Sequence, residues 1–195
     1  MSSQATWTPP QSFFTHAQAR AWGLSQRAIT ELRDSGQIRL LRRGIYASAD
    51  APLADLELIE IATRTDRPTM CLTSALAHHG LIDDIPARID LALPRTMRPP
   101  AASTAIRWHR FDDARFDLGR TTMLIADGYT LGLYSSQRCI VDAFRMRAQE
   151  GTELGVTALK RWLTLPGSQP SDLLALAREF PRAHGPLHEA MDILM

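Results

Sequence analysis

Hydrophobic residues in the first part of the chain recur at helical spacing in two short stretches separated by a turn. The first stretch predicts a helix from about Thr15 to Trp22, with Thr15 as its N-cap and Gly23 as its end. The second stretch predicts a helix from Ser25 to Ser35, with Ser25 as its N-cap. One face of this second helix is apolar and carries Ala28, Ile29 and Leu32. The pattern therefore predicts a pair of short helices joined by a tight turn.

A short basic stretch, RLLRRGIYAS, follows the second helix. Its apolar residues predict one strand over residues 38–41 and another over residues 45–47, with a turn at residues 42–44. Gly44 can adopt the positive φ that a tight hairpin or its bulge needs. A helix pair followed by a hairpin is typical of a winged helix-turn-helix, which we expect to cover residues 12–50.

The rest of the chain mixes helical and strand patterns. Ser135 is a suitable N-cap for a helix over SSQRCIVDAFRMR, and three more helical patterns begin at about Thr152, broken near Pro166 and at Pro181. Further helices are predicted at residues 54–64 and 74–81, strands at 87–95 and 105–111, and a hairpin at 120–134 with its turn at Asp127-Gly128. We therefore predict an α+β fold. It comprises a flexible arm at residues 1–11, the winged helix-turn-helix, and a C-terminal α+β domain at residues 51–195, with a small mixed sheet and helices.

Composition places the chain among ordinary globular proteins. It has 195 residues, of which 45% are hydrophobic and 22% charged, and its formal net charge is +1. Residues 1–50 carry six arginines against three acids, a balance of +3, so the remainder carries −2. A basic head on a slightly acidic body favours a small unit that faces nucleic acid.

No feature of the sequence indicates secretion or a membrane. Cys71 and Cys139 stand far apart in apolar surroundings, which is typical of core residues in a reducing compartment. The N-terminus has no signal-peptide pattern, and no uncharged apolar run approaches the ~20 residues that span a bilayer. We expect a soluble cytoplasmic protein.

The chemistry of the predicted second helix and hairpin suits DNA. A helix fits the major groove, where its N-terminal side chains meet base edges, and arginines at a hairpin tip reach phosphates or the minor groove. Arg27, Thr30, Arg42 and Arg43 are the strongest candidates. The full predicted set of DNA contacts is Ser25, Gln26, Arg27, Thr30, Arg33, Arg39, Arg42 and Arg43. The alternative is a plain helical hairpin whose arginines form a solvated face.

Two other polar groups in the sequence admit a different interpretation. His78 and His79, together with Asp84, suggest a metal-assisted enzyme, but adjacent histidines on a helix point about 100° apart. Histidines near the last carbonyls of a helix are the simpler interpretation, so we predict no catalytic residue, no metal and no cofactor. A second basic group either extends a DNA footprint or is a solvated sheet face; it consists of Arg95, Arg98, Arg107 and Arg110.

The N-terminal phrase FFTHAQARAWGLSQRAITELRDSGQIRLLRRGIYAS resembles the N-terminal domain of the AbiEi-type antitoxins of type IV toxin–antitoxin (abortive infection) systems. The similarity continues in the order of the segments SALAHHGL, IPARIDLALPR, AIRWHRF and YSSQRCIVDAFRM. The matching positions in the first phrase are Phe14, Thr15, Ala19, Gly23, Leu24, Leu32, Gly36, Ile38, Leu41, Arg43, Gly44, Ile45 and Tyr46.

This resemblance implies a repressor that binds double-stranded DNA at repeats upstream of its own gene. It further implies that the C-terminal domain acts as an antitoxin against a nucleotidyltransferase-like toxin, without a stable complex. We expect a monomer or a weak dimer, with cooperativity on DNA left open. Two alternatives stay open as well: a stand-alone winged-helix regulator, and a protein-interaction module without a toxin partner.

Overall fold

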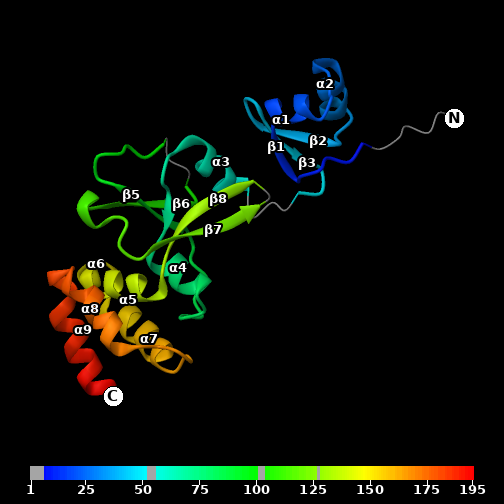
Figure 1. Cartoon of the computed structure of the whole chain (residues 1–195). Helices are drawn as coiled ribbons and strands as arrows, with labels where there is room; N and C mark the ends of the chain where they lie inside the picture. The colour runs from blue at the N-terminus through cyan, green and yellow to red at the C-terminus, as the bar shows by residue number, and fades with distance from the viewer. Residues whose placement is uncertain (1–6, 52–55, 101–103, 127) are drawn as a thin grey trace. The chain divides into compact units, whose positions relative to one another are not determined.

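The computed structural model describes residues 7–51, 56–100, 104–126 and 128–195. The chain forms two compact units (Figure 1). The first unit comprises residues 1–66 and 124–130, and the second comprises residues 67–123 and 131–195. Helices and two mixed or antiparallel sheets are both present, so the predicted α+β class is confirmed.

The first unit begins with the helices and hairpin that the sequence predicts. Thr15 caps α1 (His16–Ala21) through a capping box with Gln18, and Ser25 caps α2 (Gln26–Asp34). Strands β2 (Ile38–Arg42) and β3 (Ile45–Ser48) form the hairpin, and Gly44 has a φ of 83° at its turn. The prediction missed β1 (Phe13–Thr15), which pairs antiparallel with β3 and gives the sheet order β1-β3-β2.

This small sheet is covered on both faces because successive side chains of a strand point in opposite directions. On one face, Phe14, Ile38 and Tyr46 pack with the α1–α2 pair, and Phe14 stacks on Tyr46 with ring centroids 5.8 Å apart. On the other face, Phe13 and Ala47 pack with Ala51, with Ile59 of α3 (Leu56–Arg64) and with Tyr129. Two small cores therefore share one sheet.

Trp7, in the described part of the predicted arm at residues 1–11, packs against the first unit. Trp7 is partly buried against the core of α1 and α2, and its ring lies 6.0 Å from Phe14 and 6.3 Å from Trp22. Residues 1–6 lie outside the described part of the chain. The predicted boundary at residue 50 stays a prediction, whereas the first compact unit extends through Asp66.

The second unit contains most of a five-stranded sheet with the order β6-β5-β4-β8-β7, and residues 124–126 of β7 and 129–130 of β8 belong to the first unit. Strand β4 pairs antiparallel with β5 and parallel with β8, and β5 pairs parallel with β6, so the sheet is mixed. The strands are β4 (Thr69–Met70), β5 (Ile89–Pro94), β6 (Ile106–Phe111), β7 (Arg120–Ala126) and β8 (Tyr129–Tyr134). The sequence predicted all of them except the central β4. Of the predicted turn between β7 and β8, Asp127 lies outside the described residues and Gly128 has a φ of 81°.

Helix α5 (Ser136–Arg145) is the centre of the helical layer, where it contacts α4, α7, α8 and α9 (Figure 1). Ser135 caps it as predicted, and seven consecutive residues, 138–144, are buried. The other helices are α4 (Leu72–His78), α6 (Arg147–Glu150), α7 (Thr152–Leu163), α8 (Pro170–Arg178) and α9 (Pro181–Leu194), with a short 3₁₀ turn at Asp113–Arg115. The three predicted C-terminal helices are α7, α8 and α9. Within the described ranges, no helix is long and apolar enough to cross a membrane.

Candidate nucleic-acid interface

The N-terminal end of α2 carries three of the predicted DNA contacts. The Ser25 hydroxyl accepts a hydrogen bond from the backbone N–H of Ala28 at 3.1 Å, so it is occupied as the helix cap. Gln26 is exposed, and its Oε1 lies 2.6 Å from Nε2 of His16. Arg27 is open to solvent, with 89% of its side chain exposed. This end of α2 therefore presents an amide and a guanidinium to solvent.

Each arginine of α2 has an acidic neighbour. Arg27 Nε lies 2.8 Å from Glu31, and this carboxylate raises the pKa of the guanidinium through its hydrogen bond and its charge. Arg33 donates to Asp34 at 2.8 Å. Pairs of this kind between exposed side chains are weak and are screened by salt. Both arginines can therefore exchange their acid for a phosphate at little cost.

Thr30 and Arg39 each donate a side-chain hydrogen bond to a backbone carbonyl of the first unit. Thr30 is half-buried and its hydroxyl donates to the carbonyl of Gln26 at 3.1 Å, one turn earlier in α2. Arg39 is half-buried on the sheet face opposite Tyr46 and donates to the carbonyl of Ala51 at 3.3 Å. These bonds give both residues a structural task, and their role as DNA contacts stays a prediction.

The hairpin turn between β2 and β3 consists of two residues, Arg43 and Gly44. The side chain of Arg43 is exposed, and within the described ranges it has no acidic partner. Gly44 accepts a hydrogen bond from the backbone N–H of His16 at 2.8 Å, which ties the turn to the start of α1. The backbone of Arg42 ends β2, but its side chain lies outside what the structure describes.

The second basic group of the sequence does not form one uniform surface. Arg107 donates to Asp90 at 2.5 Å and to Glu150 at 2.8 Å, so two carboxylates neutralise it. Arg110 donates to the backbone carbonyl of Arg95, and both of these arginines line a cavity in the second unit. The group therefore splits into one neutralised arginine and an arginine-lined hollow, with Arg98 exposed elsewhere.

The histidine pair lies at the end of α4. Nε2 of His79 is 2.7 Å from the carbonyl oxygen of Tyr134, and the two imidazole rings of His78 and His79 lie edge to face. In the part of the chain that the structure describes, no three His, Cys, Asp or Glu side chains are grouped to hold a metal ion. The His79 ring is thus engaged with a strand carbonyl.

The sequence interpretation missed a buried ionic cluster on α5. Arg138 is 1% exposed and Asp142 is not exposed at all, and they are joined at 2.9 Å. Arg145 binds the second oxygen of Asp142 at 2.8 Å, and Arg138 also donates to the carbonyls of Arg115 and Leu118 at 2.8 and 2.5 Å. A signal was available, since an Arg and an Asp one helical turn apart interrupt an otherwise apolar segment.

Comparison with known proteins finds a likeness among solved structures. No family model matches the chain, and no curated protein sequence matches it. Among solved structures, the chain is similar to the RV2827C protein from Mycobacterium tuberculosis, with 18% sequence identity and a TM-score of 0.47. The similarity covers 86% of this chain and 76% of that one. A likeness at this level says nothing about function.

Proposed function

We propose that this protein is a DNA-binding regulator of transcription. In this proposal, β1 to β3 with α1 and α2 form a winged helix-turn-helix, α2 enters the major groove, and the β2–β3 hairpin is the wing. The N-terminal half of α2 contacts bases, while the turn of the hairpin contacts the phosphate backbone.

The observation that carries the proposal is the presence of two exposed arginines, Arg27 and Arg43, in one small unit. Arg27 extends from the first turn of a capped helix, and Arg43 stands at a hairpin turn without an acid partner in the described ranges. The turn is anchored to α1 by the bond from His16 to Gly44. A helix start also presents free N–H groups and a partial positive charge, which favour phosphate.

The resemblance to AbiEi-type antitoxins supports a more specific form of the proposal. In that form the protein represses its own gene and counters a nucleotidyltransferase-like toxin without binding it stably. Co-expression tests this part: if a neighbouring gene encodes such a protein and its expression stops growth, this chain should restore growth. If the protein represses its own gene but does not restore growth, the remaining proposal is a stand-alone regulator.

The DNA-binding proposal is tested by titrating the full chain against labelled DNA from upstream of its own gene, over a series of salt concentrations. Arg43→Ala should weaken binding and should lower the slope of log K against log salt by about 0.9, because one phosphate contact is lost. Arg27→Ala should weaken binding and reduce discrimination between this DNA and an unrelated duplex.

Two matched variants sharpen this test. Arg64→Ala removes an exposed arginine on α3, outside the proposed interface, and should leave binding unchanged. Glu31→Gln removes the carboxylate that pairs with Arg27 and should strengthen binding, since both the competing partner and a negative charge near DNA are gone. The proposal is overturned if no upstream DNA binds at moderate salt, or if Arg64→Ala weakens binding as much as Arg43→Ala does.

A further inference from the structure

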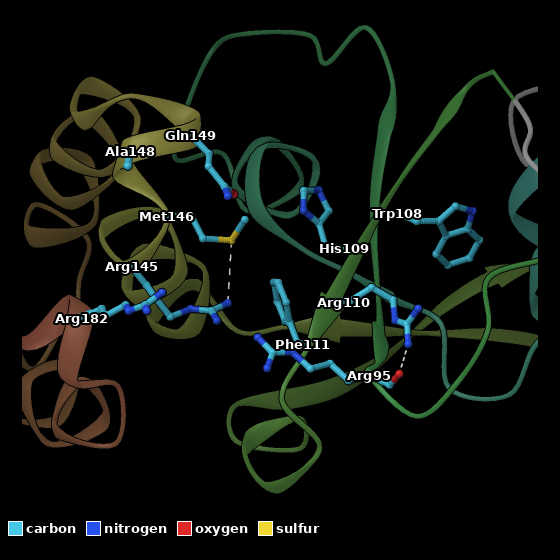
Figure 2. A pocket seen from close by; sticks show the side chains of 10 residues that line it. All are labelled: Arg95, Trp108, His109, Arg110, Phe111, Arg145, Met146, Ala148, Gln149 and Arg182. Atoms are coloured by element: carbon cyan, nitrogen blue, oxygen red, sulfur yellow. Dashed lines mark hydrogen bonds between the residues drawn. The ribbon is translucent and has the colours of Figure 1, made fainter.

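The second unit contains a cavity of about 400 Å³ between the edge strand β6 and the helical layer. This volume lies within the range of small-molecule sites, roughly 300–1,000 Å³. Figure 2 shows the side chains that line it, with Arg145 and Arg182 on the helical side and Arg95 and Arg110 on the strand side. The full lining is Arg95, Trp108, His109, Arg110, Phe111, Arg145, Met146, Ala148, Gln149 and Arg182.

The charge of this lining is one-sided. It includes four arginines and no aspartate or glutamate. Arg95 and Arg182 are exposed, and in the described ranges their guanidinium groups form no ion pair with a carboxylate. Guanidinium groups gathered in a hollow repel one another, and a bound anion relieves that repulsion.

The cluster beneath the cavity, which includes Arg145, does not cancel this positive charge. Arg138 and Arg145 share the single carboxylate of Asp142, so the buried cluster keeps one net positive charge. Asp142 and the Phe111 ring, whose centroid lies 4.5 Å from the Arg145 guanidinium carbon, hold that side chain in place. Arg145 is thus a fixed cation facing the hollow, and fixed cations bind anions with little loss of side-chain entropy.

Helix α9 contributes from the same side. It begins at Pro181, has no side-chain cap, and places Arg182 in its first turn at the cavity. A 14-residue helix directs a partial positive charge at whatever lies before its first turn. The arginines, the buried cluster and this helix start all favour the same kind of ligand.

We propose that this cavity binds the oligophosphate group of a small molecule. Three of its arginines, Arg95, Arg145 and Arg182, also line an adjoining cavity of about 470 Å³, which additionally contains Asp112 and Glu179. The shared arginines are therefore where the phosphates bind. The phosphates point into the cavity without acids, since the carboxylates of Asp112 and Glu179 would repel them in the adjoining one. Guanidinium groups suit this task because their planar N–H pairs match phosphate oxygens.

The test is isothermal titration calorimetry of the full chain with pyrophosphate, ATP and adenosine at low salt. Pyrophosphate and ATP should bind at one site, and adenosine should not, because it lacks phosphate. Arg95→Gln and Arg182→Gln each remove an exposed charge and should raise the dissociation constant about tenfold, as expected for a lost charge-assisted hydrogen bond. Arg178→Gln removes an exposed arginine of α8 that does not line the cavity and should bind like the unaltered chain.

A further variant separates this site from the proposed DNA interface. Arg27→Gln/Arg43→Gln should abolish DNA binding and leave the ATP affinity unchanged. The inference is overturned if that double variant loses ATP binding, if Arg178→Gln weakens binding as much as Arg182→Gln, or if neither phosphate compound binds. Binding of a single-stranded oligonucleotide at Arg95 and Arg182, without binding of pyrophosphate, would overturn it as well.

Discussion

The second unit contains a buried carboxylate on β5 that two basic side chains contact. Asp90 on β5 is 1% exposed; its carboxylate accepts from Arg107 at 2.5 Å and lies 2.8 Å from Nε2 of His109. Burial alone would raise the pKa of Asp90, but the hydrogen bonds from His109 and Arg107 outweigh burial and leave that pKa below its ordinary value. The folded protein therefore favours the ionised form of Asp90.

This lowered pKa makes stability depend on pH in a defined direction. The unfolded chain takes up a proton at Asp90 near the ordinary value of about 3.9, whereas the folded chain does so at a lower pH. The contribution of Asp90 is thus fully present above about pH 5 and is lost as pH falls through the folded-state pKa. Urea unfolding from pH 7 down to pH 3 should show a steeper loss for the unaltered chain than for Asp90→Asn. Equal pH dependence of the two would contradict this.

At the scale of one element, Ser25 has an observed role as the N-cap of α2 and a proposed role as a DNA contact, and two substitutions distinguish these roles. Ser25→Ala removes the hydroxyl that accepts from Ala28 and should lower the free energy of unfolding by about 1 kcal/mol. Ser25→Asp restores a capping oxygen and places a negative charge at the helix start, so stability should return. If α2 meets DNA there, that same charge should weaken DNA binding. Thermal unfolding and the DNA titration, run on both variants, measure the two effects.

Elements were predicted correctly where neighbouring residues carry the signal, and they were missed where the signal depends on segments far apart in the sequence. The caps at Thr15 and Ser25 and the turn at Gly44 are local signals, and the corresponding helices and hairpin were predicted correctly. Strands β1 and β4 were missed because three and two residues carry no readable alternation, and only their partners in the sheet define them. The arginine-lined cavity was missed for the same reason, since its residues come from strands and helices far apart in the sequence.

At the scale of the whole molecule, the unit that carries the proposed DNA interface is not continuous in the sequence. Residues 124–130, from the ends of β7 and β8, belong to it together with residues 1–66. Tyr129 is 8% exposed, and its ring packs edge to face on Phe13, with centroids 6.5 Å apart. The core on the α3 face of the small sheet therefore depends on a side chain more than sixty positions away along the chain.

Removing the Tyr129 ring should loosen the first unit, including α1 and α2. Tyr129→Ala leaves a cavity beside Phe13 and should lower the free energy of unfolding of this unit by about 3 kcal/mol, whereas Tyr129→Phe keeps the ring and should stay close to the unaltered chain. Leu124→Ala, which changes a side chain that is 66% exposed in the same segment, serves as the matched control.

Hydrogen exchange of the amides in β1, β3, α1 and α2 measures the effect region by region. Faster exchange there in Tyr129→Ala alone, with weaker DNA binding, is the expected result. If a fragment of residues 1–66 instead exchanged as slowly as the full chain, residues 124–130 would not support the core of this unit.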